Sequence, residues 1–274
     1  MADISLTAGM RANLFNLQQT SKLMETTQSR LATGLKVQSA LDDPVAFFKA
    51  EEHRQRASDL AGRKDEMSEA IGTVKAANNG IEAITDLIEA AKSLAQSAQS
   101  ESSSTDRQTL QTQFNSMLSQ INNLSNDSGY KGVNLLNGTS DTLVVTFDAD
   151  GNNKLTLQGF DAEVGTSGLS ISSAANWDDS TFGNASTVIT QLDSAKDKLR
   201  TETQKLSNNL SIITSRQEFT DKMINTLEDG AAALTNADMN EEGANMLMLQ
   251  TRQALGTTSL SLASQAAQAV LRLF

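Results

Sequence analysis

The two ends of the chain carry apolar residues at helical spacing. Near the C-terminus, alternating steps of three and four residues reach Met246, Leu249, Gln253, Gly256, Leu260, Ala263, Ala267, Val270 and Phe274. This spacing places the set on one helical face, and only Gln253 and Gly256 interrupt its apolar character. A second line repeats every seventh residue beside it, at Met248, Leu255, Leu262 and Ala269. The apolar arc is therefore wide, and we predict that another surface covers it.

The N-terminal segment has a matching pattern. The same steps, taken from Met10, reach Leu14, Leu17, Ser21, Met24, Gln28, Leu31 and Leu35. Both ends are poor in charge, which suits helices packed side by side within an assembly. We therefore predict that the two terminal helices pair. The predicted assembly interface consists of Met10, Leu14, Leu17, Met24, Leu31, Leu35, Met246, Leu249, Leu260, Ala263, Val270 and Phe274.

Two much longer helical patterns occupy the interior of the chain. One begins at Asp43-Pro44, a pair suited to the N-cap and first helical position, and continues to about residue 99. A helix of that length would extend about 80 Å. The other pattern covers residues 192–234. Gly34 and the segment NADMN (236–240) separate these long helices from the terminal ones, so each half of the chain contains a joint.

Shorter elements are predicted between the long helices. Apolar positions from Leu110 to Leu124 indicate a third helix that folds back on the second. The sequences TLVVTF and KLTLQGF flank DADGNN and predict a β-hairpin at about 142–160. The predicted fold class is mainly α: a long antiparallel helical or coiled-coil bundle with paired N- and C-terminal helices and a small β-hairpin region.

Composition excludes several kinds of partner. The 274-residue chain has a net charge of -11 and no cluster of Lys and Arg, so we expect no nucleic acid and no anionic membrane surface as partner. It has no cysteine, which excludes disulfides and a thiol nucleophile. The start, MADISLTAGMRANLF, lacks the features of a secretory signal peptide. No apolar stretch approaches the roughly 18 residues of a membrane span, so we predict no membrane insertion.

No residue pattern indicates catalysis or a cofactor. His53 is the only histidine and lies in the charged run 49–66, where a surface role is expected. Asp148, Asp150 and Asn152 alternate like calcium ligands, but the sixth and twelfth loop positions lack the required Gly and Glu. A hairpin turn explains this segment better. We therefore assign no catalytic, metal-binding or cofactor-binding residue.

Four motifs occur in order along the chain and resemble the bacterial flagellins, the subunits of the flagellar filament. ATGLKVQSALDDP (32–44) is similar to the flagellin N-terminal signature, and YKGVNLLNG (130–138) to a turn of that family. ADMNEEGANM (237–246) and QAVLRLF (268–274) are similar to its C-terminal segments. The motifs cover both ends of the chain, so the resemblance concerns the whole chain.

The resemblance implies a secreted, non-enzymatic subunit that polymerises into the extracellular flagellar filament for swimming motility. It implies an inner core of residues 1–42 and 236–274 and an outer rod of residues 43–235. The implied partners are other copies of the chain in a helical homopolymer, the hook-associated junction and cap proteins, and an export chaperone of the type III pathway. It also suggests O-linked sugars on exposed rod residues, with the candidates Thr166, Ser167, Ser172 and Ser173.

Two alternatives remain open at this stage. A junction protein between hook and filament would share the plan of helical termini. A secreted coiled-coil adhesin would keep its heptads unbroken, whereas here a hairpin and two joints interrupt them. Only residues 165–184 separate the hairpin from the returning helix, so we predict no separate outer domain.

Overall fold

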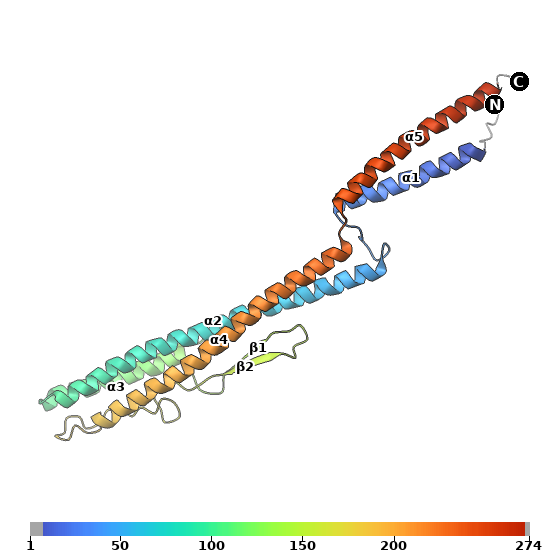
Figure 1. The fold of residues 1–274 in the computed structure, drawn as a ribbon. Coiled ribbons are helices and arrows are strands. Elements are labelled where there is room, and N and C mark those ends of the chain that lie inside the picture. Colours follow the sequence, from blue (N-terminus) through green and yellow to red (C-terminus); the bar gives the residue numbers. More distant parts are fainter. Residues whose placement is uncertain (1–7, 272–274) are drawn as a thin grey trace. The chain divides into compact units, whose positions relative to one another are not determined.

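The computed structural model describes residues 8–271, apart from the side chains of Ala267, Val270 and Leu271. Its described part confirms the predicted fold class, with long helices and one two-stranded hairpin (Figure 1). The elements in chain order are α1 (Ala8–Thr33), α2 (Pro44–Ser100), α3 (Ser104–Asp127), β1 (Thr142–Thr146), β2 (Lys154–Gln158), α4 (Ala185–Thr235) and α5 (Met239–Leu271). The chain forms two compact units. Unit 1 comprises Met1–Gln55 and Thr226–Phe274, and unit 2 comprises Arg56–Asn225.

The beginnings of three helices follow from capping residues. Asp43 accepts hydrogen bonds from the amides of Val45 and Ala46, both at 3.0 Å, so α2 starts where the Asp-Pro pair predicts. Ser103 caps α3 by accepting from the Asp106 amide at 3.3 Å. Asp238 caps α5 in the same way as Asp43 caps α2. These capping residues are local features of the sequence, which is why helix starts can be predicted from it.

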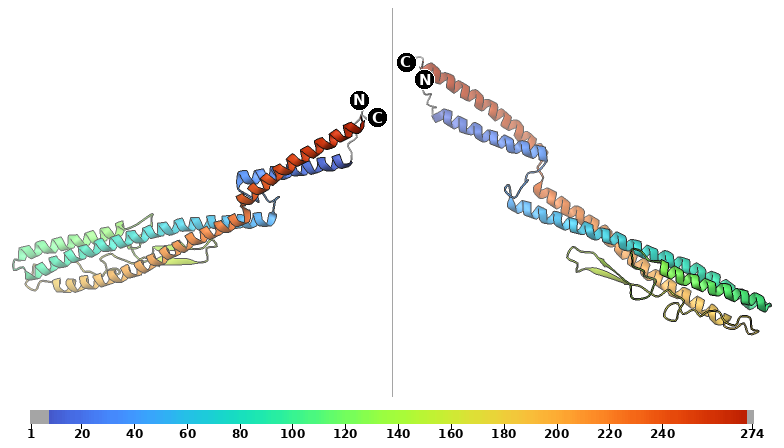
Figure 2. Two further views of the ribbon diagram at one scale, coloured as in Figure 1. Left: turned by 45° about the horizontal axis from the view of Figure 1, so that its top comes forward. Right: turned by 180° about the vertical axis from the view of Figure 1, so that it is seen from behind.

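In unit 2, α2 and α4 run antiparallel beside each other (Figure 2). Lys64 on α2 pairs with Asp221 on α4, and Glu89 on α2 pairs with Lys196 on α4 at 2.7 Å. Residue numbers thus rise along one helix as they fall along the other. Alanines on α2 lie fully buried in the core of unit 2, and small side chains of this kind allow neighbouring elements to approach closely. These alanines are Ala91, Ala95 and Ala98.

Helix α3 folds back along α2, as predicted, and completes the core of unit 2. Its buried residues are spaced at three and four, at Phe114, Leu118 and Ile121. The hairpin adds the buried residues Val145 and Leu157. In its antiparallel register, Val145 pairs with Leu155, and Leu157 pairs with Leu143. Unit 2 is therefore a three-helix core with the hairpin packed against it.

Residues 161–184, here called the strap, contribute to the same core. Trp177 is fully buried, and its ring lies 5.1 Å from that of Phe114. Leu169 and Ile171 are also buried. The Gly, Ser, Thr and Asp content of this segment is typical of a loop, and its sequence pattern predicts no core residue. The strap thus belongs to unit 2 and forms no separate unit.

Polar side chains of α3 bind the backbone of the strap. The Asn115 side chain donates to the Ala174 carbonyl at 3.1 Å and accepts from the Ala174 amide at 2.8 Å. One turn earlier, the Gln111 side chain accepts from the Trp177 amide at 2.9 Å. An extended segment outside a sheet needs such partners, since its amide and carbonyl groups are otherwise unpaired. The α3 side chains therefore replace a neighbouring strand.

Arg107 on α3 connects two loops of unit 2. It is buried, and its guanidinium lies 5.2 Å from the centre of the Phe182 ring. Its three nitrogens donate to backbone carbonyls of two separate loops, and no carboxylate among the described residues pairs with it at salt-bridge distance. The accepting residues are Glu101, Ser102, Trp177, Asp178 and Asp179. Carbonyl dipoles thus compensate the desolvation of this charge.

The turn after α3 is attached to α2 through Glu69. The Glu69 carboxylate accepts from the Lys131 ammonium at 2.8 Å and from the Tyr130 hydroxyl at 3.1 Å. Gly72 makes room for the Tyr130 ring, since a Cβ there would lie 3.1 Å from it. The bonds from Lys131 and Tyr130 lower the pKa of Glu69, and the same carboxylate raises the pKa of Lys131.

This arrangement predicts an acid-dependent contribution to stability. A carboxylate with a lowered pKa stabilises the fold at neutral pH, and this stabilisation is lost as the pH falls through its lowered folded pKa. Glu69→Gln is therefore expected to unfold at lower urea concentration than wild type at pH 7, with the difference closing at acid pH, once Glu69 of the wild type is protonated in the folded state. Glu82→Gln, at an exposed position of the same helix, is the control. An equal difference at both pH values would contradict the assignment.

Candidate assembly interface

Helices α1 and α5 lie side by side in unit 1, as predicted (Figure 1). They approach closely where Gly256 faces Leu17, because a Cβ at residue 256 would lie 2.6 Å from Leu17 Cδ2. Next to this contact, Asn13 Nδ2 donates to Ser259 Oγ at 3.2 Å. Gly256, one of the two residues that interrupt the apolar face of α5, is thus small enough to permit the contact with Leu17.

An ion pair joins the ends of the two helices nearest the joints. Arg30 in the last turn of α1 donates to Glu242 in the first turn of α5 at 2.9 Å. A cation at a helix C-terminus and an anion at a helix N-terminus both interact favourably with the helix dipoles. The Glu242 side chain is only 10% exposed, so solvent screens this pair less than the surface pairs of unit 2.

Backbone hydrogen bonds connect the two joints. The amides of Lys36 and Val37 donate to the Thr235 carbonyl at 2.7 and 3.2 Å, and the Ala237 amide donates to the Gly34 carbonyl at 2.9 Å. Gly34 has a φ of 72°, the left-handed conformation that ends a helix and that glycine adopts without strain. The joints therefore form one short antiparallel bridge, and they fix where α1 and α5 start to pair.

Most of the predicted interface residues are buried or partly buried within the chain. Met10 and Leu249 are buried, whereas Leu14 is 40% exposed. The side chain of Val270 and the whole of Phe274 lie outside the described residues. The remaining predicted residues are partly buried: Leu17, Met24, Leu31, Leu35, Met246, Leu260 and Ala263. Their role in contacts between copies stays a prediction.

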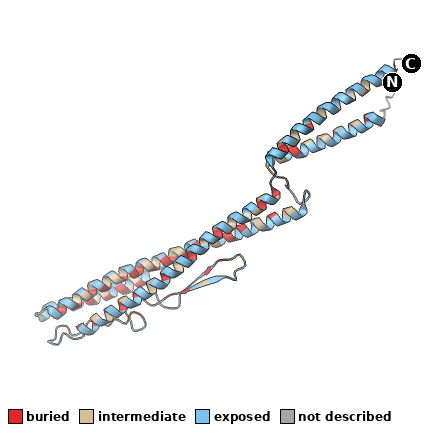
Figure 3. Cartoon of the chain, in the orientation of Figure 1, coloured by how far each residue is buried: buried red, intermediate tan, exposed pale blue. Residues whose placement is uncertain are grey.

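A second set of apolar side chains remains exposed on the same two helices. On α5 this outer line consists of Met248, Leu255 and Leu262, which the sevenfold repeat had indicated, together with Leu247. On α1 it is joined by Phe15 and Leu23, which no repeat had indicated. Figure 3 shows α1 and α5 mostly exposed or partly buried, in contrast to the buried stripe of unit 2. Between Gly243 and Leu271, α5 carries a single charge, at Arg252.

The glycosylation candidates lie on the strap. Thr166, Ser167, Ser172 and Ser173 are all exposed. The Ser172 hydroxyl accepts from Gln191 Nε2 at 3.1 Å, so it is partly engaged, whereas no hydrogen bond is found for the other three hydroxyls. Modification of these residues stays a prediction.

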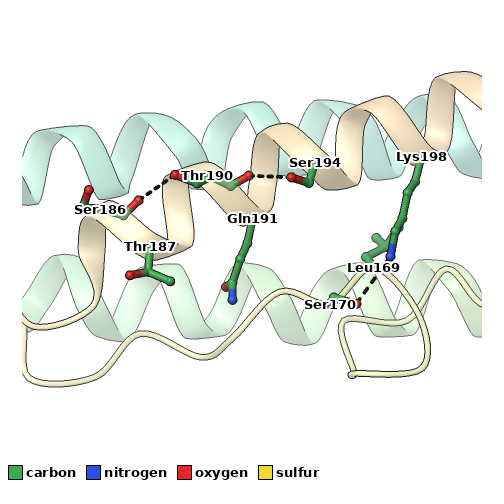
Figure 4. Close-up of a pocket in the computed structure, with 8 residues that line it drawn as sticks. All are labelled: Leu169, Ser170, Ser186, Thr187, Thr190, Gln191, Ser194 and Lys198. Carbon is green, nitrogen blue, oxygen red and sulfur yellow. Dashed lines mark hydrogen bonds between the residues drawn. The ribbon is translucent and has the colours of Figure 1, made fainter.

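A groove beside the strap is lined largely by hydroxyl groups (Figure 4). Thr190 donates to the Ser186 carbonyl at 3.3 Å, and Ser194 donates to the Thr190 carbonyl at 3.0 Å. Lys198 donates to the Gly168 carbonyl at 3.1 Å and bridges to the strap. The Lys198 bond thus joins α4 to the strap, whereas the bonds of Thr190 and Ser194 lie within α4.

Residues 8–271 show neither a candidate metal site nor a helix able to span a membrane. No group of three His, Cys, Asp or Glu side chains in this range could hold a metal ion. None of the helices there combines the length and apolar character needed to cross a bilayer. His53 packs against α4, where a Cβ on Gly230 would lie 3.7 Å from His53 Cδ2.

Comparison with known proteins gives consistent matches to one family. The model of the bacterial flagellin N-terminal helical region matches residues 4–141, half of the chain. A flagellin of Brucella melitensis is 29% identical, with 100% of this chain and 99% of the relative covered. Flagellin FljK of Caulobacter vibrioides is also 29% identical, with 99% and 98% covered. A crystal structure of Bacillus cereus flagellin covers 57% of this chain and 88% of its own, at 20% identity and a TM-score of 0.48.

The relatives match over almost their whole length and have a length similar to this chain. These matches favour a flagellin over the junction-protein and adhesin alternatives. The paired terminal helices, the two joints and the hairpin occur where the sequence patterns predict them. Taken together, the sequence match and this arrangement show that the chain belongs to the bacterial flagellin family.

Proposed function

We propose that this flagellin polymerises through the apolar side chains that α1 and α5 leave exposed once they have paired within the chain. As a flagellin, the chain is a structural subunit of the extracellular flagellar filament and not an enzyme. The observation that supports the proposal most is the outer line on α5, Met248, Leu255 and Leu262, on a helix with almost no charge. A terminal helix that is apolar on two sides needs a second covering surface.

Burial of these side chains provides a driving force of suitable size. Full burial of one Leu, Met or Phe side chain contributes about 1.5–3 kcal/mol. The six exposed side chains of the outer line on α1 and α5 would therefore contribute on the order of 10 kcal/mol in contacts between copies. Association costs about 4–15 kcal/mol in lost translational and rotational freedom. The two terms are similar, so growth depends on several contacts forming at once.

The predicted division of the chain enters the same proposal. Residues 1–42 and 236–274 would form the inner core of the filament, and residues 43–235 the outer rod. The bridge between the joints supports this division, because it links the N- and C-terminal segments at the start of the paired helices. Junction, cap and chaperone proteins of the flagellar system would contact the exposed terminal helices before or during assembly.

A double variant tests the proposed role of the outer line. Leu255→Ser with Leu262→Ser is expected to raise the critical concentration for seeded polymerisation at least tenfold, since each substitution removes about 1.4 kcal/mol or more of burial. The helical content of the monomer should not change, because both leucines are exposed. Sedimentation of filaments at several protein concentrations provides the measurement.

The control places substitutions at exposed polar positions of the same helix. Gln250→Ser with Gln265→Ser shortens two side chains without removing apolar surface. This control should polymerise at the wild-type critical concentration. An unchanged critical concentration in the leucine variant would show that the outer line is not an assembly surface.

A further inference from the structure

Three large apolar side chains are exposed at the joint between α1 and α2. Leu41 is 96% exposed, and Val45 and Phe48 on the first turns of α2 are each 64% exposed. Here they are called the joint patch. Val45 and Phe48 are three residues apart, so they lie on neighbouring positions of one helical face. Exposure of these apolar side chains to water is unfavourable, and no described segment of unit 1 covers them.

The joint holds Leu41 in a defined position. The Asp42 carboxylate accepts from the amides of Gln38 and Ser39, both at 3.0 Å, and the Asp42 amide donates to the Ser39 carbonyl at 3.1 Å. These two amides lower the pKa of Asp42, so it is charged at neutral pH. Asp43, the cap of α2, is the next residue. The joint patch is therefore an apolar surface with two carboxylates beside it.

Helix α4 carries a second exposed apolar surface, in unit 2. Ile212 is 45% and Phe219 is 54% exposed, and their separation of seven residues places them on one face. Arg216 lies between them, with its guanidinium 5.4 Å from the centre of the Phe147 ring. It forms no ion pair within the part of the chain that the structure describes. Ile212, Arg216 and Phe219 are here called the α4 patch.

The two patches are complementary in chemistry. Each combines apolar side chains with charge, which is negative at the joint patch and positive at the α4 patch. A helical polymer of one chain is built from heterologous contacts, in which one surface of a copy meets a different surface of the next. Such contacts require two unlike surfaces on every subunit, and these two satisfy that requirement.

We propose that the joint patch of one copy docks on the α4 patch of a second copy in the filament. Leu41, Val45 and Phe48 then cover Ile212 and Phe219, and Arg216 approaches the carboxylates of Asp42 and Asp43. The inference rests on the proposed function, because it requires a polymer. It adds a contact outside the paired terminal helices, which sets how neighbouring copies are aligned.

Cysteine cross-linking tests this contact directly, because the chain has no cysteine of its own. In filaments of Leu41→Cys/Ile212→Cys, mild oxidation should give a ladder of covalent multimers on a denaturing gel. Mixing the two single variants should give the covalent dimer between them, which proves a contact between copies. The matched control is Leu41→Cys/Ser207→Cys, since Ser207 is exposed on α4 but lies on a different face from Ile212. Its cross-linking should be at least tenfold slower.

The outcomes separate this inference from the function on which it rests. Filaments that form normally but cross-link no faster than the control, in both the double variant and the mixed single variants, would overturn the docking and leave polymerisation intact. Wild-type chain that forms no filaments on seeds would instead contradict the proposed function. A ladder in oxidised monomer solution, before any seeding, would also overturn docking within the filament.

Discussion

Trp177→Ala is expected to lower the free energy of unfolding of unit 2 by about 3–5 kcal/mol, the range for removing a buried aromatic side chain. Trp177 is fully buried against Phe114, and its Nε1 donates to Asn184 Oδ1 at 3.0 Å. The substitution removes the largest apolar side chain that the strap contributes to the core. The cavity would lie between α3 and the start of α4, where the strap fills the space.

Urea unfolding followed by far-ultraviolet circular dichroism measures this loss, because the variant lacks the only tryptophan as a fluorescent probe. Trp177→Phe is the matched variant. It keeps much of the apolar volume and loses the Nε1 hydrogen bond, so a smaller loss of about 1–3 kcal/mol is expected. Equal stability of Trp177→Ala and wild type would show that the strap does not contribute to the core.

Arg107→Met is expected to lower the free energy of unfolding by about 3 kcal/mol or more, because it removes five hydrogen bonds, one to the buried Trp177 carbonyl and four to partly buried carbonyls. Arg107 connects the loop before α3 to the strap residues that precede α4. Its apolar replacement retains part of the packing against Phe182 but offers no hydrogen bond. The strap should therefore detach locally before unit 2 unfolds, with faster hydrogen exchange at residues 174–184.

Two further variants separate charge from geometry at this position. Arg107→Lys keeps the cation but has one nitrogen in place of the planar fork, so we expect an intermediate loss of stability. Arg56→Met, at an exposed position of α2, should change stability by less than about 0.5 kcal/mol. Wild-type exchange rates in the strap of Arg107→Met would contradict the role given to this side chain.

The helices and joints were predictable because their signals are local. Asp43-Pro44 starts α2, Gly34 ends α1, and Asp238 starts α5, each through bonds to residues within four positions. The hairpin follows from two alternating segments around a turn with a Gly in the left-handed conformation at residue 151. The strap was not predictable in this way, because its hydrogen-bond partners on α3 lie 37 to 72 residues away in the chain.

The candidate assembly interface shows the same division at the level of single residues. The spacing of apolar residues placed Leu249 and Leu255 on two apolar lines of the terminal helix. It did not predict which of the two lines faces α1. The structure decides this through Gly256, whose missing side chain admits Leu17 and thereby turns Leu249 inward and Leu255 outward. Phe15 and Leu23 follow no repeat, so only the packed pair identifies them as exposed.

The sequence by itself determined the helical fold class, the positions of the joints and the membership of the flagellin family, since these depend on periodicity and on short motifs. Only the tertiary structure decided which apolar side chains are buried within the chain and which remain exposed. The physical reason is that burial depends on the distance between surfaces brought together by folding. A heptad pattern identifies apolar positions whose burial is favourable, but the position of the neighbouring helix determines which of them are buried.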